Sequence, residues 1–160
     1  MSPRRNSQSG VSLVELVSVT AIILTLAGLT LPVANTFVKR QKEIELRQAL
    51  RGLREALDRF KADTERFPGI RTLHLDATNE EGYPEELEWL VEGVDIGDAS
   101  GTKIKYLRRI PRDPITGERD WGTLSSRDIP DSLFSDGINI FNVYSLSDKI
   151  ALDGTKYRDW

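Results

Sequence analysis

A single carboxylate, that of Glu15, lies inside a long apolar segment near the start of the chain. Between Val11 and Val38, Glu15 is the only ionisable residue. As a helix this segment would be roughly 42 Å long, whereas the hydrocarbon core of a bilayer is about 30 Å thick. A charge that faces lipid costs about 2–3 kcal/mol or more, so carboxylates in such segments are functional by default. The segment therefore predicts a membrane helix whose carboxylate has a partner.

The residues around Glu15 form a specific pattern. A basic head, MSPRRNSQSG, ends at Gly10, Glu15 is the fifth residue after that glycine, and Pro32 follows further along. With the run VSLVELVSVTAIILTLAGLTLP and an amphipathic continuation to about Thr64, this pattern resembles the type IV pilin and type II secretion pseudopilin family. Val11 departs from it, because the family most often has Phe or Met there. Many type IV pilins close their C-terminal region with a disulfide, and this chain has no cysteine. It is therefore most similar to the G-type major pseudopilin.

The resemblance implies how the N-terminus is processed and used. Prepilin peptidase would cleave after Gly10, and the new amine on Val11 would be methylated. That amine is cationic near neutral pH. In a low dielectric it attracts the carboxylate of Glu15 on a neighbouring subunit, and each group is penalised when unpaired. This pairing would set the axial register between subunits. The alternative is a local role, in which Glu15 interacts only with the N-terminus of its own helix.

Pro32 lies inside the apolar segment, where it removes one backbone hydrogen bond and should bend or loosen the helix. In the resembled family this region can melt when subunits pack into a fibre. The alternative is a proline that a membrane helix simply tolerates. Pro32 is therefore, with Glu15, a candidate assembly residue.

The segment 11–38 is expected to cross the membrane once. A cleaved secretory signal would have a shorter apolar region, of about 7–15 residues. Basic residues flank both ends of the segment, so the charge bias does not fix its orientation. The resemblance implies an inner-membrane protein with a cytoplasmic N-terminus and a periplasmic globular domain. The expected organisation is a leader over residues 1–10, a transmembrane and assembly helix over 11–38, and a periplasmic domain over 39–160 that includes the amphipathic half of the helix.

The amphipathic half of the expected helix carries one apolar stripe. The stripe consists of Leu46, Leu50, Leu53, Leu57 and Phe60. These residues recur every three or four positions and so share one face of a helix. Because the stripe is too short for a convincing coiled coil, we expect it to pack against the protein's own sheet. Phe67-Pro68-Gly69 predicts the end of the helix.

Beyond the helix the chain is rich in predicted loops. We expect a short helix from Pro84 to Val91 that stops at Gly93, a strand near Trp121, and a longer strand over 138–145, INIFNVYS. Residues 95–103 are expected to form a turn-rich connector. The predicted fold class is α+β. One long N-terminal helix, with an apolar membrane half and an amphipathic polar half, packs on a small antiparallel sheet of two to four strands.

Composition limits the chemistry that the chain can perform. Its 160 residues allow one modest domain beyond a membrane anchor. The formal charge of −3 argues against nucleic-acid binding, and the absence of cysteine excludes disulfides and thiolate metal sites. No GxSxG, P-loop or HExxH motif occurs, and His74, the only histidine, lies in a predicted polar loop. The sequence therefore does not predict an enzyme.

The tail carries a candidate calcium site that follows from the resemblance. G-type pseudopilins bind calcium in a loop after their last strand, through Asp and Ser side chains and backbone carbonyls. The corresponding candidates are Asp148, Asp153, Ser145, Leu146 and Ser147. Calcium takes six to eight oxygen ligands, and the loop here is shorter than the family's and lacks its Gly-rich, multiply acidic pattern. The alternative is a turn capped by Ser and Asp side chains.

Together with the resemblance, these features predict a structural subunit. It would be a pseudopilin of a type II secretion pseudopilus, which polymerises through its N-terminal helix and supports protein export. The expected partners are copies of itself, minor pseudopilins, prepilin peptidase, the inner-membrane assembly platform and the membrane, and no nucleic acid. The alternatives are a type IV pilus or competence pilin and, from another class, a membrane-anchored periplasmic binding module or enzyme. Glu15 favours assembly, because a plain anchor gains nothing from a buried charge.

Overall fold

The computed structural model describes residues 10–74, 78–129, 132 and 134–160, and for residues 29–34 it describes the backbone alone. The helices are α1 (Leu13–Arg66), α2 (Pro68–Leu73) and α3 (Glu88–Glu92), and a 3₁₀ turn spans Tyr157–Asp159. The strands are β1 (Val94–Asp95), β2 (Lys103–Ile104), β3 (Gly122–Leu124) and β4 (Asn142–Tyr144). The chain divides into an N-terminal unit, residues 1–39, and a C-terminal unit, residues 40–160. Helix α1 therefore contributes its first part to one unit and its second part to the other.

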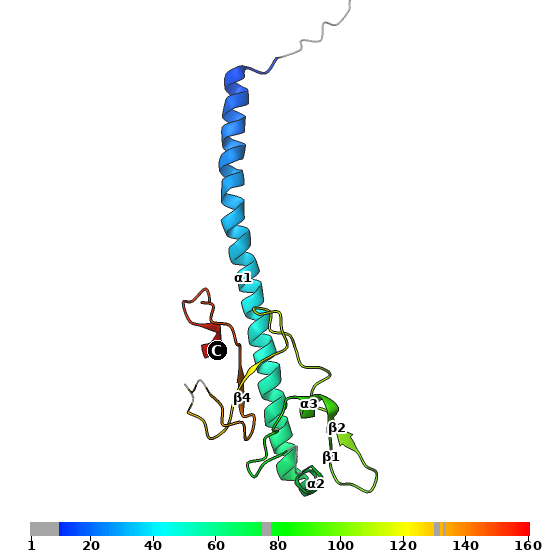
Figure 1. The fold of residues 1–160 in the computed structure, drawn as a ribbon. Coiled ribbons are helices and arrows are strands. Elements are labelled where there is room, and N and C mark those ends of the chain that lie inside the picture. The colour runs from blue at the N-terminus through cyan, green and yellow to red at the C-terminus, as the bar shows by residue number, and fades with distance from the viewer. Residues whose placement is uncertain (1–9, 75–77, 130–131, 133) are drawn as a thin grey trace, which may run out of the picture. The chain divides into compact units, whose positions relative to one another are not determined.

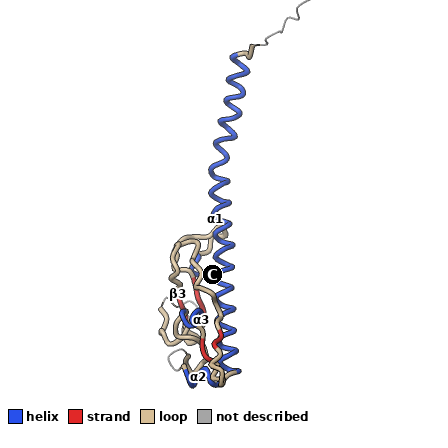
Figure 2. Tube along the Cα trace, turned by 90° about the vertical axis from the view of Figure 1, so that its right-hand side faces the viewer, coloured by secondary structure: helices blue, strands red, loops and turns tan. Residues whose placement is uncertain are grey.

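The second part of α1 supplies the centre of a hydrophobic core. All five residues of the predicted stripe, from Leu46 to Phe60, are at most 1% exposed, which confirms the expected face. They pack with Val94 of β1, Val143 of β4 and Tyr157 near the C-terminus. Figures 1 and 2 show the strands and loops of the C-terminal unit gathered around this part of the helix. The stripe thus packs against the protein's own strands, as predicted.

Helix α1 ends at Arg66, immediately before the predicted stop signal. A second helix, α2, then begins at Pro68, because a proline suits the first helical position, where no backbone donor is needed. This helix was not predicted. A Cβ on Gly69 would overlap the carbonyl oxygen of Ile96 and lie 2.8 Å from the Cα of Gly97. The glycine therefore allows α2 to pack directly against the backbone that follows β1.

The strands confirm the α+β class but form two separate antiparallel sheets rather than one. β1 pairs with β2 and β3 pairs with β4. The first sheet lies in the segment expected to be a turn-rich connector, where strands of two residues are too short to give an alternating pattern. The predicted strand over 138–145 is also shorter, since the N–H of Ile140 donates to Pro84 at 2.8 Å, outside any ladder. Loops, rather than a wider sheet, therefore complete the core.

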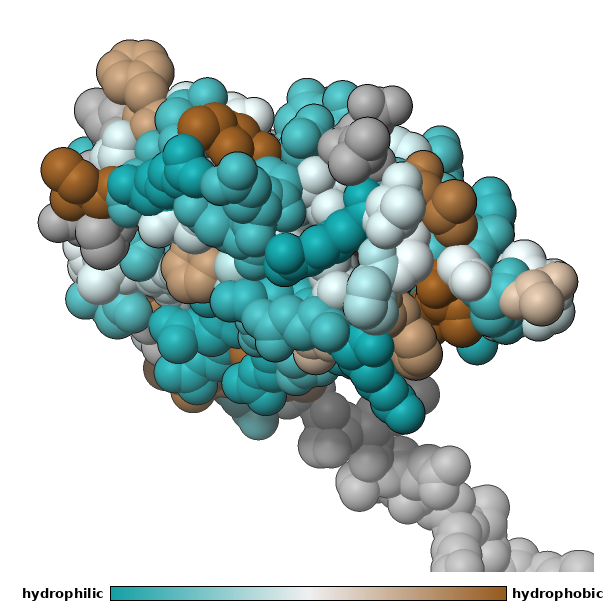
Figure 3. Space-filling view, turned by 90° about the horizontal axis from the view of Figure 1, so that it is seen from below, coloured by the Kyte–Doolittle hydropathy of each residue, from teal (hydrophilic) through white to brown (hydrophobic). Residues whose placement is uncertain are grey.

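The surface of the C-terminal unit is mainly polar. In Figure 3 most of the visible face is hydrophilic, and hydrophobic side chains occur on it singly or in small groups.

The predicted helix at 84–91 is shorter in the structure, where α3 covers only Glu88–Glu92, and it stops at Gly93 as expected. Gly93 has a φ of +81°, a conformation that favours glycine at the end of a helix.

The N-terminal unit contains the first part of α1, and its described apolar side chains are exposed. Each of the large apolar residues among Leu13–Leu26 named next is at least 48% exposed. They are Leu13, Val14, Leu16, Val17, Val19, Ile22, Ile23, Leu24 and Leu26. Among the described residues, which leave out the side chains of 29–34, no helix is both long and apolar enough to cross a membrane.

Candidate assembly surfaces

Gly10 and Val11 lie ahead of the first helical turn. Both residues are exposed, and α1 begins only at Leu13. The backbone N–H of Leu16 donates to the carbonyl of Ser12 at 3.0 Å, which closes the first turn of the helix. A Cβ on Gly10 would meet no atom within 4 Å. The bond predicted to be cleaved therefore lies in open, non-helical backbone, the form that a protease can reach.

Glu15 lies in the first turn of α1 and is exposed. The other polar side chains of the apolar segment are satisfied within the helix. The hydroxyls of Ser18, Thr20 and Thr25 each donate to the carbonyl four residues earlier, at 2.7–2.8 Å. Among the described side chains of Leu13–Gly28, Glu15 is therefore the one polar group without a partner in its own chain. The serine and threonine bonds were not predicted, although Ser and Thr in an apolar helix commonly bond back in this way.

Pro32 can be placed only by its backbone. The helical backbone of α1 continues through residues 29–34, and the side chain of Pro32 lies outside the described residues. The expectation that Pro32 loosens the helix stays a prediction.

Two of the calcium candidates, Ser145 and Ser147, are buried. The hydroxyl of Ser145 donates to Oδ2 of Asp113 at 2.5 Å and accepts the backbone N–H of Ser147 at 3.2 Å. The hydroxyl of Ser147 accepts the N–H of Lys149 at 3.3 Å. These hydroxyls therefore hold the backbone after β4 in a turn, and Leu146 between them is half exposed.

The two acidic candidates each have an arginine as their partner. Asp148 forms an ion pair with Arg158 at 3.3 Å, and Asp153 forms one with Arg47 at 3.5 Å. Oδ1 of Asp153 also accepts the N–H and the hydroxyl of Thr155, at 2.9 and 2.6 Å. These hydrogen bonds hold the pKa of Asp153 below its usual range. As arranged, the donor set is a turn capped by Asp and Ser side chains, and its carboxylates contact cations of the protein itself.

Asp113 is a buried carboxylate that sequence reasoning missed. Besides Ser145, its carboxylate accepts the backbone N–H groups of Ile115 at 2.7 Å and Thr116 at 3.4 Å. The pairing crosses 32 residues of sequence, so no local spacing reveals it. The available signal was Asp before Pro and a Thr-Gly turn, because Asp at the first position of a turn commonly bonds the backbone two residues on.

Arg54 connects the helix to the C-terminal segment. Its guanidinium donates to Oδ1 of Asn142 at 2.8 Å and to the carbonyls of Val143 at 3.0 Å and Trp160 at 2.5 Å. Arg47, two turns earlier, lies over the ring of Trp160 at 4.0 Å. Burial lowers the pKa of Arg54. The last residues of the chain are thereby held against the second part of α1.

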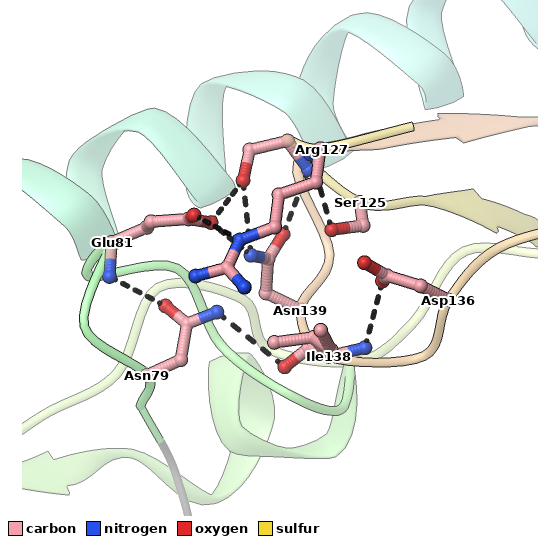
Figure 4. Close-up of polar contacts among 8 residues, drawn as sticks. Asn79, Glu81, Ser125, Arg127, Asp136, Ile138 and Asn139 are labelled. Carbon is pink, nitrogen blue, oxygen red and sulfur yellow. Dashed lines mark hydrogen bonds and ion pairs between the residues drawn. The ribbon is translucent and has the colours of Figure 1, made fainter. Parts of the chain in front are cut away.

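Figure 4 shows a polar cluster that joins two loops. Glu81 bonds the hydroxyl of Ser126, accepts Nε of Arg127 at 2.6 Å and accepts Nδ2 of Asn139 at 2.6 Å. The hydrogen bond from Ser126, followed by that from Arg127, lowers the pKa of Glu81. Asn139 is 1% exposed. The cluster accordingly fixes the chain before β4 against the loop around Glu81, which is a structural role.

His74, expected in a polar loop, directly follows the last residue of α2, and its side chain is packed rather than fully solvated. It is half buried, its Nε2 accepts the backbone N–H of Asp95 at 2.9 Å, and its ring meets Trp89 edge-on with centroids 5.8 Å apart. His74 thus ties the end of α2 to β1. Within the described ranges, no three His, Cys, Asp or Glu side chains gather into a metal-binding group.

Comparison of this chain with protein-family models, with curated proteins and with solved structures found no match.

Proposed function

We propose that this chain is a fibre-forming subunit, a pseudopilin that polymerises through its N-terminal helix. The observation that carries the proposal is Glu15, an unpartnered carboxylate in the first turn of α1, where the large apolar side chains from Leu13 to Leu26 are all exposed. A helix that is apolar on every face requires an apolar environment outside its own domain. A lone carboxylate in such an environment requires a cationic partner, and the amine of Val11 on a neighbouring copy supplies one.

The proposed life cycle begins in the inner membrane. Segment 11–38 spans it with the N-terminus in the cytoplasm and residues 39–160 in the periplasm. Prepilin peptidase removes residues 1–10, Val11 is methylated, and the assembly platform adds the subunit to a growing fibre with minor pseudopilins. The fibre serves protein export by a type II secretion system. A type IV pilus or competence pilin is the closest competing proposal, and a membrane-anchored periplasmic module or enzyme is the competing proposal from another class.

Processing separates the fibre subunit from a plain anchor. We expect the intact mass of the protein extracted from membranes to match a chain that begins at Val11 and carries one added methyl group. The exposed, non-helical backbone at Gly10 and Val11 supports this expectation. Retention of residues 1–10, or cleavage within the apolar segment, would contradict the proposal.

Assembly is tested by removing only the charge of Glu15. We expect Glu15→Gln and Glu15→Leu to insert into membranes as well as the wild type, because each removes an unfavourable charge from lipid. Both variants should lose most of the crosslinked multimers that the wild type forms. The matched control is Ser18→Ala, since the hydroxyl of Ser18 is already bonded to its own helix. If Glu15→Gln and Ser18→Ala give equal yields of crosslinked multimers, Glu15 interacts only with its own helix and has no role in assembly.

A further inference from the structure

Charge is distributed unevenly along the C-terminal unit. Residues 80–102 include eight acidic side chains and no basic one, whereas residues 103–119 include six basic and two acidic side chains. Most of these side chains are exposed. Because both segments belong to one chain, every copy carries two regions of opposite charge, and complementary charges favour association in a defined register.

Three arginines line a hollow of about 470 Å³ in the basic segment. They are Arg109, Arg112 and Arg119, with Ile110 and Pro111 completing the lining. All three are exposed, and within the part of the chain that the structure describes none of them forms an ion pair. The hollow therefore concentrates positive charge that none of the described carboxylates contacts directly.

The carboxylate next to Arg112 in the sequence is engaged elsewhere. Asp113 is wholly buried, and it bonds Ser145 and the backbone N–H of Ile115. These bonds fix the loop that carries the arginines, so the guanidinium groups project from a supported backbone. A planar guanidinium can donate two parallel hydrogen bonds to one carboxylate. The hollow is thus suited to carboxylates from another molecule.

A second groove of about 490 Å³ adjoins the first, because Ile110 and Arg119 line both. Its lining also includes Glu85, Glu86 and Glu88, which are exposed and, among the described residues, have no ion-pair partner. An acidic edge and a basic edge therefore border one continuous surface.

We infer that this surface is a contact between two copies of the chain, in which Glu85 and Glu86 of one copy bind Arg109 and Arg112 of the next. The inference rests on the proposed fibre, which holds copies of the domain close together. The acidic and basic edges are different parts of this surface, so a contact in which the acidic edge of one copy meets the basic edge of the next is heterologous and can repeat along a fibre. Each pairing also relieves repulsion among the like charges of its own edge.

Cysteine crosslinking of the full chain tests the contact directly, because the chain has no cysteine of its own. Glu86→Cys and Arg112→Cys are co-expressed in the same membranes with tags of different size. Oxidation should give a mixed dimer several-fold more abundant than with Lys156→Cys as the partner. Lys156 is an exposed basic residue that is not part of either lining. Equal yields with the two partners would overturn the inference.

Charge reversal identifies the occupant of the hollow. The paired change Arg109→Glu with Arg112→Glu, or Glu85→Arg with Glu86→Arg, places like charges opposite each other, and each should lower the yield of formaldehyde-crosslinked multimers about tenfold. A chain with all four changes should recover the wild-type yield, which a misfolded domain would not do. If only the arginine changes lower the yield, the hollow binds some other acidic molecule, and the contact between copies is wrong.

The outcomes separate this inference from the proposed function. If the yield of crosslinked multimers falls in the Glu15 variants but not in either charge reversal, the fibre proposal stands and this contact alone is overturned. If the yield does not fall in the Glu15 variants, the fibre proposal is overturned instead. In that case the mixed disulfide between positions 86 and 112 still measures the contact between copies. If that disulfide does not form, the contact is overturned as well.

Discussion

In the first part of α1 the described leucine, isoleucine and valine side chains are exposed, whereas in the second part the five residues of the stripe are buried almost completely. The backbone is helical in both parts. The difference lies in the pattern of side chains. Apolar residues occur on every face before Gly28, but after Arg40 they recur every three or four positions and charged residues occupy the other faces.

This comparison shows that one helix can serve two purposes. A single apolar stripe can be buried by the strands and loops of the same chain, as the stripe from Leu46 to Phe60 is. A helix that is apolar all round exceeds what one small domain can cover. The second part of α1 is therefore covered by its own domain, whereas the described large apolar side chains of the first part are exposed.

The largest expected effect comes from truncating the same residue type in each part. Leu53 is fully buried and Leu24 is 67% exposed. Leu53→Ala should lower the free energy of unfolding of the C-terminal unit by about 2–5 kcal/mol, because it leaves a cavity. Leu24→Ala should leave that free energy unchanged. Urea unfolding of the full chain in detergent, followed by tryptophan fluorescence, measures this difference, because Trp89, Trp121 and Trp160 all lie in the C-terminal unit.

A similar loss of stability in Leu24→Ala would break the comparison, since it would mean that the first part of the helix also belongs to the folded core. The comparison also predicts that a fragment of residues 40–160 folds alone. A disordered circular-dichroism spectrum for that fragment would contradict it.

A smaller loss of stability is expected from Arg54→Ala. Arg54 donates to Asn142, Val143 and Trp160, and removing a charged donor from such acceptors costs about 1–3 kcal/mol. Arg54→Lys should recover part of the loss, because lysine keeps the charge but not the planar fork. Urea unfolding measures both variants. The control is Arg51→Ala, an exposed residue that should change stability by less than about 0.5 kcal/mol.

If Arg54→Ala proves as stable as Arg51→Ala, the C-terminal segment is not held by this arginine. The other contacts of that segment with the helix, which include the stacking of Arg47 on Trp160 and the packing of Tyr157 in the core, would then hold it.

Features with a period were predictable from the sequence, and features that join distant residues were not. The stripe from Leu46 to Phe60 follows from its spacing, and the end of α1 follows from Phe67-Pro68. The bonds of Arg54 to Val143 and of Asp113 to Ser145 cross 89 and 32 residues. They depend on how the loops pack, and no local pattern encodes that packing.

The candidate functional residues fall into the same two groups. Glu15 could be chosen as a candidate from the sequence alone, because a charge in an apolar run is conspicuous in any sequence. The arginine-lined hollow was not, because Arg109, Arg112 and Arg119 are brought together by a loop whose shape depends on the buried Asp113. The sheet of β1 and β2 was missed because strands of two residues carry too little alternation to be recognised. The pair β3 and β4 lies where strands were expected, near Trp121 and within 138–145.

Acid should weaken the C-terminal unit partly through Glu81. The pKa of Glu81 is lowered in the folded protein by its bonds to Ser126 and Arg127, from an ordinary value of about 4.3. Its contribution to stability is therefore complete above that value and is lost as the pH falls through the lower, folded pKa. Glu81→Gln should have a lower melting temperature than the wild type at pH 7, and the gap should narrow towards pH 2.

Melting curves between pH 7 and pH 2 measure this gap, with the exposed Glu118→Gln as the control. The pKa of Asp98 is also lowered, to about 2, chiefly by a hydrogen bond from Thr102. The wild type and Glu81→Gln therefore both lose some stability in acid. The informative quantity is the difference between their melting temperatures at each pH. A gap that stays constant with pH would show that Glu81 acts only through contacts that do not depend on its charge.

The smallest expected effect is that of calcium on the C-terminal unit. Asp148 and Asp153 contact Arg158 and Arg47, and Asp153 also caps the turn at Thr155. An ion that recruited both carboxylates would have to displace these partners. We therefore expect the full chain in detergent to melt at the same temperature in excess calcium and in chelator.

Calcium bound at a hundredfold excess over its Kd would stabilise the native state by about 2.7 kcal/mol, which corresponds to a rise of several degrees in the melting temperature of a domain of this size. A shift of that size, abolished by Asp148→Ala with Asp153→Ala, would establish a metal site in the tail. It would also show that the packing of its own side chains is not the whole source of the stability of the C-terminal unit.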